Sequence, residues 1–145
     1  MLRPLRFLER SLGIEVNCVQ CGTDGIVEPQ EVEAAIQPNT KLIVLTHASN
    51  VTGAIQPVAE VGAIAKQRGI RYLVDAAQSI GHIPVRAAEL QADLIAAPGH
   101  KGLLGPLGTG VLYVAPEVEE SLRPSRQGGT GTTSENDWQQ FPLTY

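Results

Sequence analysis

Two residues with the chemistry of a cofactor site stand directly after apolar runs typical of buried strands. Asp75 follows Tyr72-Leu73-Val74, and Lys101 follows soon after the apolar run 94–97. Because ligands of open α/β sheets bind outside the carboxyl ends of parallel strands, we expect both side chains at one edge of a sheet. A partly desolvated carboxylate requires a cationic partner, and lysine bonds covalently to carbonyl groups. The pair therefore suggests a site for an aromatic cationic cofactor that bonds to Lys101.

Each residue also has a simpler interpretation. Asp75 could cap the turn that follows it, and Lys101 could be a solvated lysine in a glycine-rich loop. Two nucleotide-binding motifs are excluded. The sequence around Lys101 lacks the glycine spacing and the following hydroxyl residue of a phosphate-binding loop. Residues 105–110 precede an expected strand, whereas a dinucleotide fingerprint precedes a helix.

The elements that must position these residues alternate between strands and helices. Gly13 and Gly69 each follow an apolar stripe at helical spacing, which is typical of a left-handed glycine after a helix. We expect strands over residues 14–19, 41–46, 70–75, 94–97 and 111–114. We expect helices that end at residue 12, open at residue 29, and span 57–68 and 116–122. This alternation predicts an α/β fold with a doubly wound, mostly parallel sheet and flanking helices.

Composition limits the class of protein. With 145 residues, 43% of them hydrophobic, the chain can bury one ordinary core. The net charge of -4, from 11 basic and 15 acidic residues without blocks, argues against nucleic acid and anionic membranes as partners. We find no apolar run of membrane-spanning length and no continuous apolar core of a signal peptide. We therefore expect a cytoplasmic protein whose partner is a small molecule.

Cys18 and Cys21 form a C-x-x-C pair. Such a pair could be a redox site, half of a zinc site or two ordinary thiols. The histidines lie far away in the sequence, so the remaining ligands of a zinc site are missing. A turn-like stretch, residues 22–25, follows the second cysteine, whereas a thioredoxin-type site needs a helix that begins at the first. We interpret the two residues as ordinary thiols that bind no metal.

Three runs in order resemble the class V aminotransferases, which are pyridoxal-phosphate-dependent enzymes of fold type I. The runs are residues 42–53, residues 74–79, and residues 99–110 with Gly99-His100-Lys101-Gly102 at their start. Within this family the chain is most similar to the cysteine desulfurases and selenocysteine lyases. The resemblance covers nearly the whole chain, as the middle of the large cofactor domain.

The resemblance implies roles around pyridoxal 5'-phosphate. Lys101 would bond covalently to the cofactor and later move the α-proton of the substrate, and Asp75 would pair with the pyridinium nitrogen. Gln78 would hydrogen-bond the phenolic oxygen, Asn50 would lie near that oxygen and the substrate carboxylate, and His100 would reach the phosphate. The substrate implied is the amino acid L-cysteine, converted to L-alanine with sulfur left on the enzyme. The full-length protein is expected to be a homodimer.

The chain also departs from the family. Pro98, two residues before His100, replaces a usual hydroxyl residue and has no N–H to offer a phosphate. The family's stacking histidine, its Gly-Thr phosphate loop and its C-terminal domain with the sulfur-accepting cysteine are not found. We therefore expect a fragment that is inactive alone: residues 1–124 are part of the cofactor domain, and 125–145 form a Gly/Thr-rich loop and tail leading toward an absent C-terminal domain. The alternatives are another class V activity, or a non-catalytic remnant or structural subunit.

Overall fold

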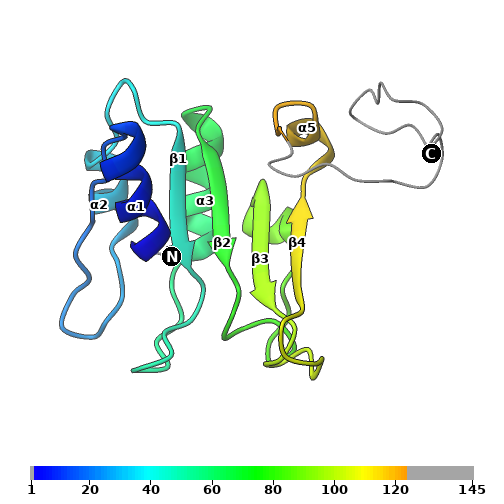
Figure 1. Cartoon of the computed structure of the whole chain (residues 1–145). Helices are drawn as coiled ribbons and strands as arrows, with labels where there is room; N and C mark the ends of the chain where they lie inside the picture. The colour runs from blue at the N-terminus through cyan, green and yellow to red at the C-terminus, as the bar shows by residue number, and fades with distance from the viewer. Residues whose placement is uncertain (1, 124–145) are drawn as a thin grey trace, which may run out of the picture.

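The computed structural model describes residues 2–123, which form a four-stranded sheet with helices beside it (Figure 1). Its strands, in order across the sheet, are β1 (Leu42–Thr46), β2 (Arg71–Asp75), β3 (Leu94–Pro98) and β4 (Gly110–Val114). The first three run parallel, and β4 is antiparallel to β3. The carboxyl ends of the three parallel strands therefore meet at one edge, where β4 begins. The mostly parallel α/β sheet predicted from the sequence is confirmed.

The core lies on one face of this sheet. Side chains alternate along a strand, so Tyr72 and Val74 of β2 point to the same face, and both are fully buried. The strand register places Val74 between Leu45 of β1 and Ile95 of β3, which makes a continuous apolar layer. Helix α3 (Val58–Gln67), which precedes β2 in the chain, adds three buried side chains to this layer: Val58, Val61 and Ala65. Each large apolar side chain buried here contributes about 1.5–3 kcal/mol.

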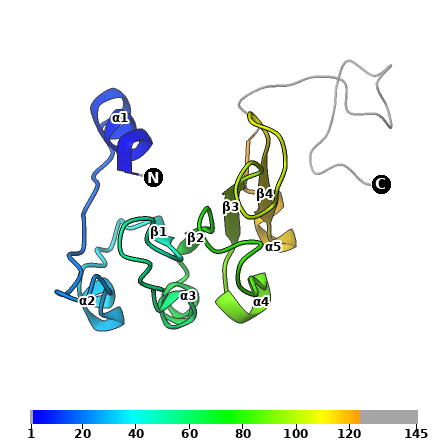
Figure 2. The same ribbon diagram turned by 90° about the horizontal axis from the view of Figure 1, so that it is seen from below.

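Helices α2 (Pro29–Ala34), α3 (Val58–Gln67) and α4 (Ala87–Leu90) lie together on this side of the sheet, as Figure 2 shows. Gly62 lets α3 approach α4 closely, because a Cβ at this position would collide with the carbonyl oxygen of Leu90. At the end of α3, the guanidinium of Arg68 pairs with the carboxylate of Glu33 at 2.6 Å. The helices thus pack on one another as well as on the sheet.

Helix α1 (Leu2–Leu12) lies on the opposite side of the sheet and has no buried residue (Figure 2). It ends as predicted at Leu12, and the following Gly13 has a φ of +67°. The strand predicted over residues 14–19 was wrong, because this segment has no regular secondary structure. A strand requires a neighbour that supplies backbone N–H and C=O groups. Within residues 2–123 no strand pairs with this segment, which is a mostly exposed connection.

The other predicted elements agree with the structure to within a few residues at their ends. Helix α5 (Pro116–Glu119) is shorter than the helix predicted over 116–122. The tail predicted over 125–145 lies outside the described residues. Over residues 2–123, no helix has both the length and the apolar character needed to cross a membrane.

Candidate functional site

Asn50 stands on a compact loop that follows β1. The backbone N–H of Gln56 donates to the carbonyl of His47 at 2.9 Å, which closes the base of the loop. Nearer the tip, the backbone N–H of Ser49 donates to the carbonyl of Ala54 at 2.9 Å. The Asn50 side chain is exposed and has no hydrogen-bond partner among the described residues. Its amide is therefore presented to solvent on a fixed backbone.

Gln56 anchors the base of this loop through its side chain, which is nearly buried. Its Oε1 accepts the backbone N–H of Val27 at 3.0 Å, and its Nε2 donates to the carbonyl of Gly25 at 2.8 Å. These bonds tie the turn before α2 to the loop that carries Asn50. The sequence analysis did not identify Gln56, because no local pattern marks a residue whose partners lie far away in the sequence.

Asp75 ends β2 and shapes the turn that carries Gln78. Its Oδ1 accepts the backbone N–H of Ala77 at 3.0 Å. This is the turn-capping contact that was the simpler interpretation of Asp75 from the sequence. The carbonyl of Asp75 accepts the backbone N–H of His47 at 2.9 Å, so the turn is joined to the β1 loop. Side-chain alternation places Asp75 on the face opposite the buried Val74. Neither its Oδ2 nor the half-buried Gln78 amide has a hydrogen-bond partner among residues 2–123.

Two glycines hold the turn with Gln78 against the loop with Lys101. Gly81 has a φ of +84°, and a Cβ at this position would collide with the backbone of Gly102. A Cβ at Gly102 would collide with the carbonyl oxygen of Ile80. The two loops therefore pack backbone against backbone, an approach that only glycine allows. This contact brings the turn after β2 and the loop after β3 together at the carboxyl edge of the sheet.

The loop that carries Lys101 is closed by its own backbone. Gly99 donates its N–H to the carbonyl of Thr109 at 2.8 Å, and the carbonyl of Lys101 accepts the N–H of Leu104 at 2.8 Å. The Lys101 side chain is half-buried, and His100 before it is exposed. In the described part of the chain the Lys101 ammonium has no ion-pair partner. The backbone at Lys101 is thus fixed while its amine stays available.

The residues expected from the sequence all stand at this one edge of the sheet, Asp75 at the end of β2 and the others on loops that follow parallel strands (Figure 1). Gln78 and Lys101 lie on the two loops joined by the glycines, and Asn50 lies on the loop after the neighbouring strand. His100 directly precedes Lys101. A carboxylate oxygen, an amide and an amine that have no partner among the described residues can together bind a cationic ring that carries oxygen and carbonyl groups.

His47 is a second residue that the sequence analysis did not identify. Its side chain is only 5% exposed, and its Nδ1 atom has no hydrogen-bond partner among residues 2–123. Burial lowers the pKa of the imidazole, so the ring is neutral at pH 7. His47 directly follows β1, as Asp75 ends β2. A histidine immediately after an apolar strand is the signal that could have identified it.

Fold and site together define an α/β protein with a ligand site at the carboxyl edge of its parallel strands. The sequence profile of the family described as aminotransferase class-V matches residues 1–145, and the chain belongs to this family. A probable cysteine desulfurase of Methanothermobacter thermautotrophicus is 47% identical over 125 residues, which are 86% of this chain and 31% of that protein. The resemblance stated from the three sequence runs is thereby confirmed.

Solved structures give the same result. The apo structure of a cysteine desulfurase from Thermococcus onnurineus NA1 matches with a TM-score of 0.82 and 39% identity over 88% of this chain and 32% of that one. The structure of SspA in complex with cysteine matches with a TM-score of 0.82 and 35% identity, over 88% of this chain and 36% of that one. The chain spans about a third of the length of these relatives.

Proposed function

We propose that this chain forms the cofactor-binding core of a pyridoxal-phosphate-dependent cysteine desulfurase. The observation that carries the proposal is the packing of Gly81 against Gly102, which joins the turn of Asp75 to the loop of Lys101. Membership of the class V family supports the cofactor. The cysteine desulfurases among the relatives, and the complex of SspA with cysteine, support L-cysteine as the substrate.

The side chains at this edge suit the groups of pyridoxal 5'-phosphate. Oδ2 of Asp75 is free to accept the N–H of a protonated ring nitrogen, and its negative charge favours that protonation. Gln78 offers an amide donor for the phenolic oxygen, and the exposed His100 offers a ring N–H for the phosphate. Asn50 has the amide donors and the exposure needed to bind the phenolic oxygen and the substrate carboxylate.

The bound cofactor supplies an electron sink for bond changes at the α-carbon of the substrate. Nζ of Lys101 would hold the cofactor covalently, and the same amine would accept the proton from the substrate α-carbon. The carboxylate of Asp75 would keep the ring nitrogen of the cofactor protonated. The half-buried position of Lys101 limits the access of water to its amine. L-cysteine would be converted to L-alanine, and its sulfur would pass to a thiol, RSH, which becomes the persulfide R–S–SH.

Absorbance spectroscopy of the chain mixed with pyridoxal 5'-phosphate tests this proposal. We expect a band at the edge of the visible range that Lys101→Ala removes. Lys41→Ala is the matched control, because Lys41 is exposed and lies just before β1, at the opposite edge of the sheet. Borohydride reduction and peptide mass analysis should place the cofactor on Lys101. A band that survives in Lys101→Ala would refute the assignment.

The proposal includes a cytoplasmic homodimer for the full-length protein. Sites of two-fold symmetric enzymes can be completed by residues of both subunits, and exposed groups such as Asn50 are then covered by the partner. Sedimentation of the full-length protein at several concentrations measures this directly. A fully active monomer would contradict the dimer and would leave the cofactor assignment in place.

A further inference from the structure

Cys18 and Cys21 lie in the irregular segment between α1 and α2, and both are exposed free thiols. Among the residues that the structure describes, no group of three or more His, Cys, Asp or Glu side chains is placed to hold a metal ion. The role of half a metal site is therefore unsupported for this pair. What distinguishes the two cysteines is their surroundings.

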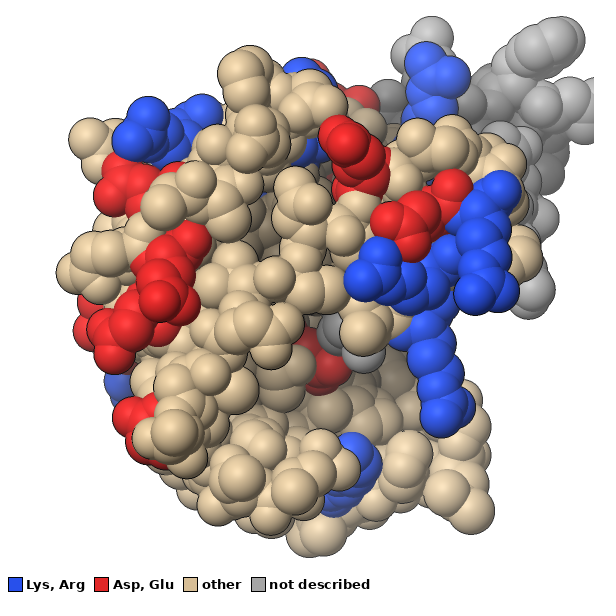
Figure 3. Space-filling view, turned by 90° about the vertical axis from the view of Figure 1, so that its left-hand side faces the viewer, with Lys and Arg blue, Asp and Glu red and all other residues tan. Residues whose placement is uncertain are grey.

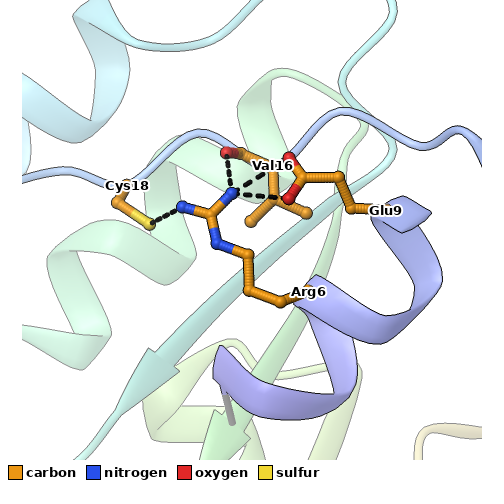
Figure 4. Close-up of polar contacts among 4 residues, drawn as sticks. All are labelled: Arg6, Glu9, Val16 and Cys18. Carbon is orange, nitrogen blue, oxygen red and sulfur yellow. Dashed lines mark hydrogen bonds and ion pairs between the residues drawn. The ribbon is translucent and has the colours of Figure 1, made fainter.

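Arg6 contacts the sulfur of Cys18 and not that of Cys21. Nη2 of Arg6 lies 3.7 Å from Sγ of Cys18, as Figure 4 shows. The other end of the guanidinium is fixed, because Nη1 donates to both carboxylate oxygens of Glu9 at 2.7 and 2.9 Å and to the carbonyl of Val16 at 3.5 Å. The hydrogen bond with Glu9 raises the pKa of Arg6. A permanent positive charge is thus held beside Cys18.

The segment can bring the two sulfur atoms together without loss of structure. Three residues of extended chain span at most about 10 Å, whereas a disulfide needs Cα atoms about 4.4–6.8 Å apart and a turn provides less than about 7 Å. Within residues 2–123, no backbone–backbone hydrogen bond involves residues 14–21. Bending this segment into a turn therefore breaks no backbone hydrogen bond of the described chain.

An open groove of about 980 Å³ connects these thiols with the candidate cofactor site. Its lining includes Cys18 and Cys21 at one part, and at another Thr46 at the end of β1 together with Ser49 and Asn50 on the loop that follows. Asp75, Gln78 and Lys101 are not among its lining residues, so the groove reaches the site on the Asn50 side. Figure 3 shows this side of the molecule, where acidic side chains lie along the left of the view and basic and acidic side chains lie next to one another at its upper left and right.

We propose that Cys18 and Cys21 are a sulfur-accepting dithiol, in which Cys18 takes up a sulfane sulfur atom and Cys21 releases it as sulfide. The donor is a persulfide, R–S–SH. The thiolate of Cys18 attacks the outer sulfur, the S–S bond of the donor breaks, and the leaving RS⁻ takes up a proton. Cys18 then carries –S–SH.

The second step releases the sulfur atom as sulfide. The thiolate of Cys21 attacks Sγ of Cys18, the persulfide bond breaks, and HS⁻ leaves as a Cys18–Cys21 disulfide forms. The two cysteines together lose two electrons, and the sulfane sulfur gains them. The choice of a persulfide donor rests on the proposed function, which leaves sulfur at this oxidation level, whereas the order of the two thiols rests on Arg6 alone.

The test uses the reduced chain without pyridoxal 5'-phosphate, mixed with glutathione persulfide and followed by intact-protein mass. We expect the wild type to end two hydrogen atoms lighter, with a Cys18–Cys21 disulfide in its peptide map. Cys21→Ser should stop one sulfur atom heavier, with the addition on Cys18. Cys18→Ser should form no disulfide and should react more slowly. Equal addition to both cysteines, without a disulfide, would overturn the proposal.

A pair of arginine variants separates the local contact from general charge. Arg6→Gln should slow the first addition by up to about fivefold, the scale of one exposed charge contact. Arg3→Gln on the same helix removes the same charge and should leave the rate unchanged. If both variants slow the reaction equally, Arg6 does not select Cys18. Because no cofactor is present, failure here leaves the cofactor proposal intact, and a failed absorbance test leaves this one intact.

Discussion

Gly81 and Gly102 approach each other so closely that the backbone of Gly102 occupies the space of a Cβ on Gly81. Gly81 lies in the connection that follows Asp75, and Gly102 directly follows Lys101. The spacing between the carboxylate and the amine of the candidate site is therefore set by backbone contact, which is stiffer than contact through long side chains.

Gly81→Ala should destabilise the protein beyond the cost of its backbone conformation. Gly69→Ala is the matched control, because Gly69 also has a positive φ, +64°, but nothing lies within 4 Å of its Cβ position. We expect about 1–2 kcal/mol for Gly69→Ala from backbone conformation alone and at least about 2 kcal/mol more for Gly81→Ala. Urea unfolding measures both values. Equal losses of stability in the two variants would show that the two loops can move apart without a cost in free energy.

Asp75→Asn should separate the two roles of this side chain. Asparagine keeps an oxygen that can accept the N–H of Ala77, so we expect the free energy of unfolding to change by less than about 0.5 kcal/mol. It lacks the charge that holds a proton on the ring nitrogen, so the affinity for pyridoxal 5'-phosphate should fall about tenfold or more. Asp75→Ala should lose both properties. Fluorescence titration and urea unfolding provide the two measurements.

Tyr72→Phe should lower stability at neutral pH and alter its alkaline limit. The hydroxyl of Tyr72 is buried and donates to the carbonyl of Val58 at 3.0 Å, so its removal should cost about 1–2 kcal/mol. Burial also raises the pKa of Tyr72 well above its ordinary value of 10.0. Only the unfolded chain then loses this proton as pH rises past about 10, so wild-type stability falls there.

The Tyr72→Phe variant should show a shallower fall in the free energy of unfolding above about pH 10. Tyr113→Phe is the control, because Tyr113 is 42% exposed and lies outside the buried core; the free energy of unfolding of this variant should differ from wild type by less than about 0.5 kcal/mol. Parallel alkaline slopes for wild type and Tyr72→Phe would contradict the assignment of this titration to Tyr72.

His47 should make stability depend on mildly acidic pH. Burial lowers its pKa below the ordinary 6.5, so as pH falls through that value the unfolded chain takes up a proton before the folded chain does. Stability is therefore present above about pH 6.5 and is lost progressively below it. His47→Phe should make the free energy of unfolding depend less on pH in this range. His100→Gln, at an exposed position, should leave the pH dependence unchanged. Urea unfolding between about pH 5 and 7.5 measures the effect.

Much of the sheet was predictable because its strands are short apolar runs. Residues 42–45 and 72–74 are apolar without interruption, which is typical of strands buried on both faces or in parallel sheets. The positions of Asp75 and Lys101 at one edge followed from the ends of these strands. Residues 14–19 begin with alternating apolar and polar residues, a pattern that is also typical of strands, yet they form no strand, since strand formation depends on a neighbour that sequence alone does not reveal.

The parts of the site that were not predictable depend on partners distant in the sequence. Gln56 bonds to Val27 and Gly25, and neither bond leaves a local pattern. The isolation of Nδ1 in His47 results from packing around the ring, which spacing does not reveal. The contact of Gly81 with Gly102 needs both loops in place, so each glycine alone looked like an ordinary turn residue. The ends of the strands thus allowed the arrangement of the site residues to be inferred. The contacts that make this arrangement rigid could not be inferred from the sequence.

The order β1-β2-β3-β4 has a consequence for how the molecule assembles. Each strand pairs with the strand next to it in the chain, so the sheet can grow by adding one neighbour at a time, with short loop closures. Asp75 reaches its position when β2 joins β1, but Lys101 is placed only after β3 has joined β2. On this order of events the acid half of the candidate site would be built first, and the amine half would be added with the third strand.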